Sequence, residues 1–297
     1  MDIQQLYTTY RPLMFSIAYR MLGLVQDAED VVQDVFVTLQ QNQDISAAHL
    51  KAYLCKMVAN RCINELKSAR RTRARYTGPW LPEPLVERVE HHPERAMELR
   101  DDLAYAFLVL LQILGPSERA VFILRETLDF SFDEISGIVD KTAVNCRKLY
   151  SRAKQKIASQ QLEEGLKLPY QPDHPHVAQA FSQAFLAGDL NHLMTLLSDG
   201  VVFVSDGGGK VKAAINPIYG KARVLALLDF SMKFNSDRKL SFTSVVNSHE
   251  GFILYREQKL TAVYSFAYTA DGKAISRIFS VMNPDKLIIS GVRAASS

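Results

Sequence analysis

The strongest constraint on the fold of this chain is a change of sequence pattern near residue 170. Before it, apolar residues recur at helical spacing, as in Leu13, Ile17 and Met21. After Pro175 come short segments rich in β-branched and aromatic residues, which are typical of strands. A length of 297 residues allows two or three domains. We therefore predict all-α modules followed by an α+β domain.

Composition excludes several classes of protein. A hydrophobic content of 47% argues against a mainly disordered chain. The longest apolar run, Leu103–Leu111, is too short to cross a bilayer, and the N-terminus lacks the pattern of a secretion signal. The three cysteines show no CxxC spacing, which argues against a disulfide scaffold or a metal site. We expect a cytoplasmic protein without membrane contact, metal or cofactor.

Proline-rich joints and local patterns divide the chain further. We predict a helical module over 1–77, a linker over 78–97, a helical module over 98–160, a linker over 161–172 and an α+β domain over 173–297. In the last domain, a helix is predicted over Gly220–Phe234, with strands over Val201–Val204, Leu240–Val246, Phe252–Tyr255, Leu260–Tyr268 and Ala274–Met282.

Charge is arranged in blocks, although the net charge is only +3. Residues 51–76 hold eight basic residues and one acidic residue, and residues 135–156 hold six basic and one acidic. Residues 1–50 and 77–134 are net acidic. Two basic blocks separated by acidic ones favour two contacts with a polyanion, although each block alone fits a solvated helix face equally well.

The second basic block has the pattern of a helix-turn-helix. Ser131 and Glu134 form a capping box that opens a short helix, and a longer helix follows a turn at Asp140–Lys141. One face of the longer helix is apolar and includes Cys146, which we expect in the core. Its polar face can enter a DNA major groove. The candidate contacts are Asn145, Arg147, Lys148, Ser151 and Arg152. The alternative is a basic surface helix of an ordinary bundle.

The first module combines an acidic helix face with a basic one. Asp27, Asp30 and Asp34 fall on one helical face, which fits a basic partner or a plain solvated surface. Between His49 and Arg75, aromatic and amide side chains alternate with cations, a mixture suited to single-stranded DNA. The candidates are Tyr53, Lys56, Asn60, Arg61, Asn64, Lys67, Arg70 and Arg71. Tyr53 fits the core equally well.

Together these pieces resemble bacterial sigma-70 family factors of the extracytoplasmic-function group. DAEDVVQDVF is similar to their core-polymerase-binding helix, SAAHLKAYLCKMVANRCINELKSARR to their promoter-melting and −10 segment, and LGPSERAVFILRETLDFSFDEISGIVDKTAVNCRKLYSRAKQKI to their −35-reading helix-turn-helix. The resemblance implies a sigma factor that binds core RNA polymerase and promoter DNA, double-stranded at −35 and melted at −10, without catalysing a reaction. It assigns core binding to Asp27, Asp30, Gln33, Asp34 and Phe36.

The last third resembles a SnoaL-like domain, an α+β cone, and a subgroup of these sigma factors carries such a domain. The shared motifs are Trp80–Leu85, Asp206–Lys210 and Asn283–Leu287. In that subgroup the domain is thought to regulate the sigma factor in cis. We expect the linker to dock near the two loops and restrain the DNA-reading modules, through Trp80, Leu81, Pro82, Asp206, Gly207, Gly208, Asn283, Pro284 and Asp285. Alternatively, Trp80 packs on the adjacent helices.

Two other interpretations remain open. SnoaL-like cones often hold a small ligand and some are enzymes, for which Asp206, His192 and His249 would be candidates, although three scattered polar residues are a weak pattern. A one-component DNA-binding regulator with a ligand-sensing or catalytic domain would leave the first 76 residues unexplained. One departure from the family is Asp140, where many sigma factors have Gly in the turn; Asp tolerates the left-handed conformation at modest cost.

Overall fold

A computed structural model describes residues 3–41, 50–73, 75–87, 104–164, 175–234, 239–247, 249–256 and 259–287. The chain forms two compact units. Unit 1 comprises residues 1–75 and 108–160, and unit 2 comprises residues 76–107 and 161–297. The boundary falls inside helix α5 (Tyr105–Leu111). Residues 76–87 therefore group with the C-terminal part of the chain, in contrast to the linker predicted over 78–97.

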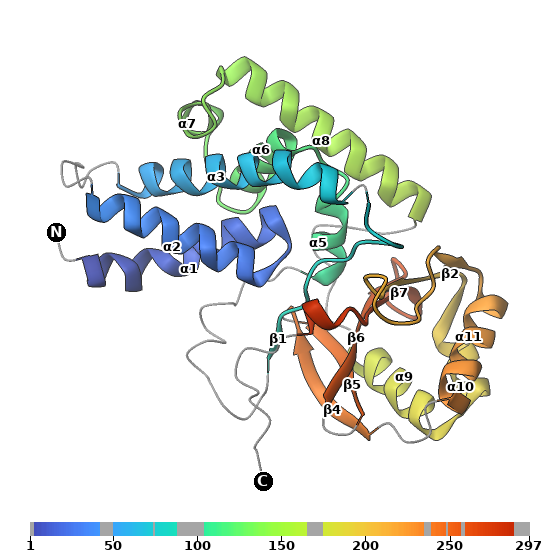
Figure 1. Cartoon of the computed structure of the whole chain (residues 1–297). Helices are drawn as coiled ribbons and strands as arrows, with labels where there is room; N and C mark the ends of the chain where they lie inside the picture. Colours follow the sequence, from blue (N-terminus) through green and yellow to red (C-terminus); the bar gives the residue numbers. More distant parts are fainter. Residues whose placement is uncertain are drawn as a thin grey trace, which may run out of the picture. The chain divides into compact units, whose positions relative to one another are not determined.

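Unit 1 begins with three packed helices (Figure 1). They are α1 (Ile3–Leu22), α2 (Val25–Gln41) and α3 (Leu50–Arg73). Their apolar stripes face inward, so that Ile17, Val35 and Leu54 are buried, as the helical spacing predicts. Gly23 adopts φ 75° and its N–H bonds the Tyr19 carbonyl, which ends α1 and lets the chain reverse into α2.

The helix-turn-helix completes unit 1 with α6 (Pro116–Glu126), α7 (Phe132–Ile138) and α8 (Ala143–Glu164). The predicted capping box is confirmed, because the Ser131 Oγ accepts from the Glu134 N–H and the Glu134 carboxylate accepts from the Ser131 N–H. Asp140 lies in the turn at φ 50°, the left-handed conformation expected for it. Helix α8 ends at Glu164.

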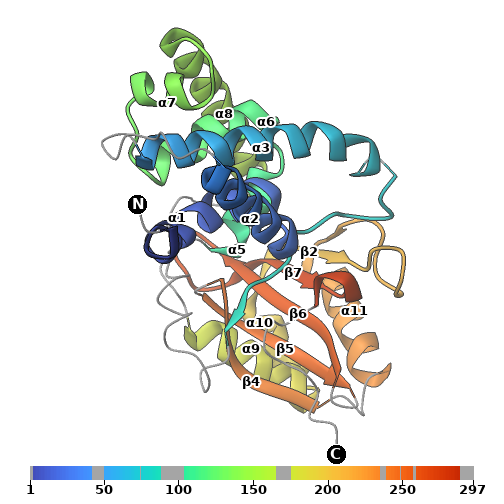
Figure 2. The same cartoon turned by 60° about the vertical axis from the view of Figure 1, so that its left-hand side comes forward.

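A buried arginine fastens the helix-turn-helix to the first three helices. Arg119 of α6 is 3% exposed, and its guanidinium donates to the Met21 carbonyl oxygen at 2.5 Å. The same group donates to the Leu114 carbonyl oxygen and to the Gln112 side chain. Helices α6 and α7 also pack on α3, as Figure 2 shows. The two helical modules predicted from the sequence are therefore parts of one packed unit.

Unit 2 is a mixed α+β domain, which confirms the predicted fold class. Its helices are α9 (Pro175–Ala187), α10 (Leu190–Leu196) and α11 (Lys221–Phe234). Its strands are β1 (Val86–Glu87), β2 (Leu197–Asp206), β3 (Ile218–Tyr219), β4 (Lys239–Val246), β5 (His249–Arg256), β6 (Lys259–Tyr268) and β7 (Ile275–Val281), with a 3-10 turn at Pro284–Lys286. Each predicted strand is present, with β2 and β5 longer than expected.

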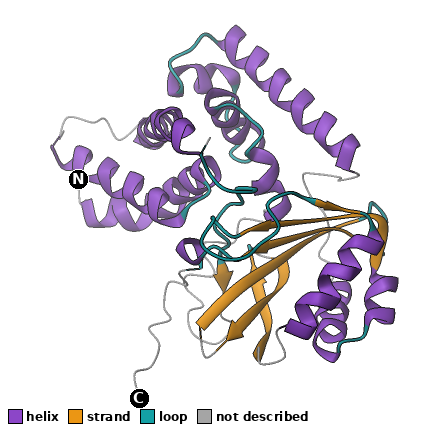
Figure 3. Ribbon diagram, turned by 45° about the vertical axis from the view of Figure 1, so that its right-hand side comes forward, coloured by secondary structure: helices purple, strands orange, loops and turns teal. Residues whose placement is uncertain are grey.

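The strands form one curved sheet in the order β1-β4-β5-β6-β7-β2-β3. All neighbours are antiparallel except β2 and β7, which are parallel. The three helices of unit 2 lie together at the sheet (Figure 3). They cover an aromatic core made by Phe181, Phe185, Phe252, Tyr264 and Phe266. Phe252 and Tyr264 stack with their ring centres 4.3 Å apart.

The segment after α3 differs from the linker predicted over residues 78–97. Leu81 is 1% exposed, and Val86–Glu87 pair with β4 as a short edge strand. The Asn247 N–H bonds the Leu85 carbonyl, and the Leu85 N–H bonds the Asn247 side chain. Prolines 82 and 84 restrict the chain to extended conformations that suit this contact. Residues 88–97 lie outside the described part of the chain. Of the second linker, predicted over 161–172, residues 161–164 belong instead to α8, and the rest lie outside the described part.

The aromatic core gives the first prediction. Phe181→Ala removes a ring that contacts Phe185, Phe252 and Phe266. It is expected to lower the free energy of unfolding of unit 2 by about 3–5 kcal/mol. Trp80 is the only tryptophan and belongs to unit 2, so its fluorescence during urea denaturation measures the effect. Met194→Ala, at a residue 48% exposed, is the control and should cost less than about 1 kcal/mol. Equal losses in the two variants would contradict the packing described here.

Candidate nucleic-acid interface and linker clamp

The acidic face of α2 is exposed. Asp27, Asp30, Gln33 and Asp34 all lie on the solvent side of the helix. Phe36 does not, because its side chain is 5% exposed and packs against Tyr7, with ring centres 4.8 Å apart. Phe36 therefore stays only a predicted polymerase contact. It lies four residues after the buried Val32 and so falls on the core face of α2.

The acidic face of α2 and the basic face of α3 meet at one ion pair. The Arg61 Nη1 lies 2.9 Å from the Asp34 Oδ2, and its Nη2 donates to the Thr38 hydroxyl at 2.9 Å. Both side chains are more than one-third exposed, so the pair adds little stability. It nevertheless joins a candidate polymerase contact to a candidate −10 contact.

The remaining −10 candidates line α3 at spacings of three or four residues. Tyr53, Lys56 and Asn60 are half-buried, whereas Asn64 and Lys67 are exposed. The Tyr53 side chain is therefore partly buried and partly accessible to solvent. Arg70 and Arg71 lie in α3, but their side chains are outside the described part of the structure.

The turn of the helix-turn-helix contacts this face of α3. The Lys56 Nζ lies 2.6 Å from the Asp140 Oδ1, and the Asn60 amide lies 3.3 Å from both the Asp140 Oδ2 and the Ile138 carbonyl oxygen. The hydrogen bond from Lys56 lowers the pKa of Asp140 below its ordinary value. Two candidate DNA contacts are thus held by a carboxylate of the same chain. Only the turn is predictable for Asp140, because no local pattern relates it to residue 56.

Helix α8 has the two faces that the sequence predicts. Cys146, Ala153 and Ile157 are buried against the neighbouring helices. The candidate DNA contacts Asn145, Arg147, Lys148, Ser151 and Arg152 are all exposed. Burial raises the pKa of the Cys146 thiol, and the same holds for Cys55 and Cys62, so all three are poor nucleophiles.

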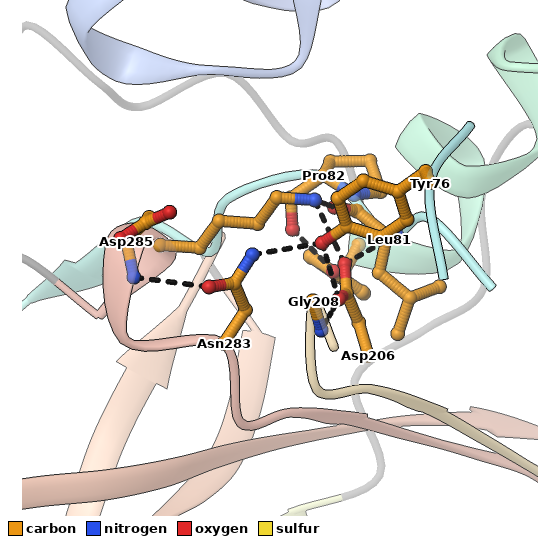
Figure 4. A network of polar contacts seen from close by, with 9 residues as sticks. Tyr76, Leu81, Pro82, Asp206, Gly208, Asn283 and Asp285 are labelled. Atoms are coloured by element: carbon orange, nitrogen blue, oxygen red, sulfur yellow. Dashed lines mark hydrogen bonds and ion pairs between the residues drawn. The ribbon is translucent and has the colours of Figure 1, made fainter. Parts of the chain in front are cut away.

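A second site lies in unit 2, where residues 76–81 meet the ends of β2 and β7 (Figure 4). We call it the linker clamp, defined by Tyr76, Trp80, Leu81, Asp206, Asn283 and Lys286. At its centre the Lys286 Nζ lies 2.8 Å from the Asp206 Oδ2, and the two side chains are 4% and 0% exposed. Leu81 joins this pair through its backbone, because its carbonyl accepts from Lys286 at 2.6 Å and its N–H donates to Asp206 at 2.9 Å.

Aromatic side chains enclose the buried ammonium group. The Lys286 Nζ lies 4.0 Å from the centre of the Trp80 ring and 5.0 Å from that of Tyr76. The Tyr76 hydroxyl donates to the Asp206 Oδ1 at 2.6 Å and accepts from the Asn283 amide at 2.8 Å. Burial, followed by the hydrogen bond to Asp206, raises the pKa of Tyr76. Every charge in the clamp therefore has a partner, as a buried charge requires.

The two loops supply the backbone of the clamp. Gly208 adopts φ 60°, its N–H bonds the Asp206 Oδ1, and a Cβ on it would collide with the Asn283 side chain. Asn283 caps the 3-10 turn that begins at Pro284. Asp285 is exposed and pairs with Lys210 at 2.6 Å. Tyr76 and Lys286 are additions to the residues chosen from the sequence. Lys286 lies within the quoted Asn283–Leu287 motif, but nothing local shows that it is buried.

Two family models match the helical part of the chain. Residues 6–72 match the family "Sigma-70 region 2" and residues 105–157 match "Sigma-70, region 4". The chain is 31% identical over 224 residues to the ECF RNA polymerase sigma factor SigJ of Mycobacterium tuberculosis, covering 75% of this chain and 70% of that protein. The chain belongs to the ECF RNA polymerase sigma factors. It is therefore a sigma factor that directs core RNA polymerase to promoters.

Two further matches extend this sigma-factor assignment. The probable ECF RNA polymerase sigma factor SigI of M. tuberculosis is 31% identical over 198 residues, which cover 66% of this chain and 67% of that protein. The crystal structure of M. tuberculosis SigJ matches with a TM-score of 0.75 and 25% identity, covering 96% of this chain and 98% of that one. The match therefore includes the C-terminal SnoaL-like domain as well as the sigma regions.

The sigma factor does not bring the candidate enzymatic residues together. Asp206 ends β2 and is held in the clamp, whereas His249 begins β5, which β6 and β7 separate from β2 in the sheet. His192 is exposed on α10. The inside of the cone holds the aromatic core described above, and its described residues give no support to a bound ligand. Within the described residues, no cluster of three metal-ligating side chains occurs and no helix is apolar and long enough to cross a membrane.

The clamp of the sigma factor gives the second prediction. Lys286→Met leaves the buried carboxylate of Asp206 without its ion-pair partner. We expect a loss of about 3–5 kcal/mol in the free energy of unfolding of unit 2, together with a red shift of Trp80 emission. Urea denaturation followed by Trp80 fluorescence measures both effects.

Lys210→Met is the matched control for this prediction. Lys210 pairs with Asp285 at 2.6 Å, against 2.8 Å for the Lys286–Asp206 pair, but both of its side chains are more than half exposed. Its replacement should cost no more than about 1 kcal/mol. Similar losses for the two variants would mean that burial does not set the strength of the Lys286 pair.

Proposed function

We propose that the chain divides its sigma-factor role among three helical surfaces. The exposed carboxylates of α2 contact core polymerase, α3 contacts the melted −10 strand and the polar face of α8 contacts the −35 duplex. The observation that carries this assignment is the two-faced burial of α8, with Ala153 inside and Arg147 and Arg152 outside. Exposed arginines can read guanine edges or neutralise phosphates in a major groove.

The −10 surface has the chemistry of a single-strand reader. Lys56, Arg61 and Lys67 supply positive charge along α3, and Asn60 and Asn64 supply amides that bond base edges. Tyr53, which is half-buried, adds an aromatic ring on the same helix. Cations that follow phosphates beside groups that hold unpaired bases suit a melted strand. Duplex recognition by α8 and strand capture by α3 together fix the polymerase on a promoter.

We further propose that the C-terminal domain modulates this activity in cis through the linker clamp. Residues 76–87 lie between α3 and the helix-turn-helix in the chain. Their attachment to the C-terminal domain therefore limits the conformations of the segment that joins the two DNA-reading surfaces. The contacts of Asp140 with Lys56 and Asn60 also restrain DNA binding, because they occupy two −10 candidates. Promoter binding would require that these contacts open.

The core-binding assignment gives the third prediction. Replacing Asp27 and Asp30 by Lys reverses the charge of an exposed face without touching the Asp34–Arg61 pair. Affinity for core polymerase should fall at least tenfold, since like charges at an interface cost several kcal/mol. Binding to purified core polymerase and run-off transcription measure it. Asp229→Lys on α11 reverses one charge in unit 2, where it also removes the Asp229–Lys233 pair, and should keep wild-type affinity for core polymerase. Unchanged core affinity in the double reversal would refute the assignment.

The Asp140 contact gives the fourth prediction. Asp140→Asn removes the negative charge but keeps a residue that tolerates φ 50°. Binding of the full-length protein to a fluorescent oligo(dT) probe should tighten about two- to fivefold, as expected for the loss of one competing surface ion pair. Asp133→Asn, an equal charge change on the exposed side of α7, is the control. If both variants gain the same affinity, net charge and not the release of Lys56 and Asn60 is the cause.

A further inference from the structure

Phe132, the first residue of α7, lies beneath two cations. The guanidinium of Arg125 from α6 is 5.4 Å from the centre of its ring, and that of Arg147 from α8 is 5.5 Å away. The ring of Tyr150 meets Phe132 edge-on with centres 5.5 Å apart. One half-buried aromatic side chain thus links all three helices of the helix-turn-helix.

Tyr150 fixes the position of the Phe132 ring. It stacks on Phe122 of α6 with centres 6.1 Å apart, and its hydroxyl donates to the Glu126 carboxylate. Burial, reinforced by that hydrogen bond, raises the pKa of Tyr150 to about 12, so the hydroxyl keeps its proton at neutral pH. Phe122, Tyr150 and Phe132 therefore form a row of rings, which we call the aromatic row.

The two arginines on Phe132 are held differently. Arg125 is half-buried, and its Nη1 also donates to the Phe130 carbonyl oxygen at 2.9 Å, which ties it to the loop before α7. Arg147 is exposed on the polar face of α8. An exposed arginine has many rotamers, and ordering it on binding costs free energy. A ring beneath the guanidinium attracts the cation and reduces the number of orientations that it samples.

We propose that Phe132 is a positioning residue that holds the guanidinium of Arg147 in the orientation used to read the −35 element. This inference rests on the proposed DNA-reading role of α8. Phe132 touches no base itself. It acts through Arg147, and the rest of the aromatic row keeps its ring in place. The effect falls on discrimination between sequences, because orientation matters for base edges and much less for phosphates.

A purely structural role makes a different prediction. If Phe132 only filled space between α7 and α8, a leucine would replace it with little loss, and any loss would be independent of Arg147. If the π face is required, tyrosine restores function and leucine does not. The two roles are therefore separated by the Phe132→Leu and Phe132→Tyr pair together with the Phe132→Leu/Arg147→Ala double variant.

The test uses full-length protein bound to core polymerase. A preferred −35 duplex is first selected from a randomised pool with the wild-type complex. The affinity ratio between this duplex and a scrambled duplex of equal length is then measured for each variant, with thermal unfolding followed by circular dichroism. Phe132→Leu should reduce the ratio about two- to fivefold, the range of an exposed cation–π contact. Phe132→Tyr should stay within about twofold of wild type. Val144→Ala, at an exposed α8 residue outside the aromatic row, should leave the ratio unchanged.

The double variant decides between the outcomes. In an Arg147→Ala background, Phe132→Leu should cause no further loss of the ratio. An equal further loss would overturn the positioning role, as would a Tyr variant as poor as the Leu variant or a Leu variant equal to wild type. If Arg147→Ala alone leaves the ratio unchanged, the DNA-reading role of Arg147 fails instead. The two failures are thus distinguishable.

Discussion

The Lys286–Asp206 pair is the interaction on which the arrangement of unit 2 depends. Two full charges lie almost without solvent contact, and a buried ion pair contributes stability only when its remaining hydrogen-bonding capacity is satisfied. The linker meets that need, because the Leu81 backbone and the Tyr76 hydroxyl bond the pair directly. The β-sheet domain thus presents a site that is complete only with residues 76–81 in place. Docking of the linker is part of the fold and not an addition to it.

Unit 1 also pairs its charged side chains, but near solvent, where the desolvation penalty is smaller. Lys56, Asn60 and Arg61 are partnered by Asp140 and Asp34, but these contacts lie near solvent and are individually weak. Such contacts organise a surface and can be exchanged for phosphate oxygens of similar charge. The deeply buried Arg119, with three partners, has no such exchange available. Burial therefore separates the contacts that persist from those that DNA phosphates can replace.

Local and long-range features differ in how far they could be predicted from the sequence. The capping box at Ser131 and Glu134, the left-handed turn at Asp140 and the polar face of α8 follow from neighbouring residues, and all are present. The family resemblance added the motifs around Asp206 and Asn283. The partners could not be predicted, because Lys286 meets Asp206 across 80 positions and Lys56 meets Asp140 across 84. The resemblance also assigned Phe36 to the polymerase contact, although its side chain lies on the core face of α2.

The short strand β1 has a consequence for the state in which the linker is released. It covers part of the outer edge of β4, with Val86 opposite Val246. An uncovered strand edge presents unpaired backbone groups and is a template for pairing with another chain. Two residues cover one end of this edge while the linker is docked. If promoter binding releases the linker, as proposed above, the molecule then carries an open sheet edge to which another strand, or the linker itself, can add.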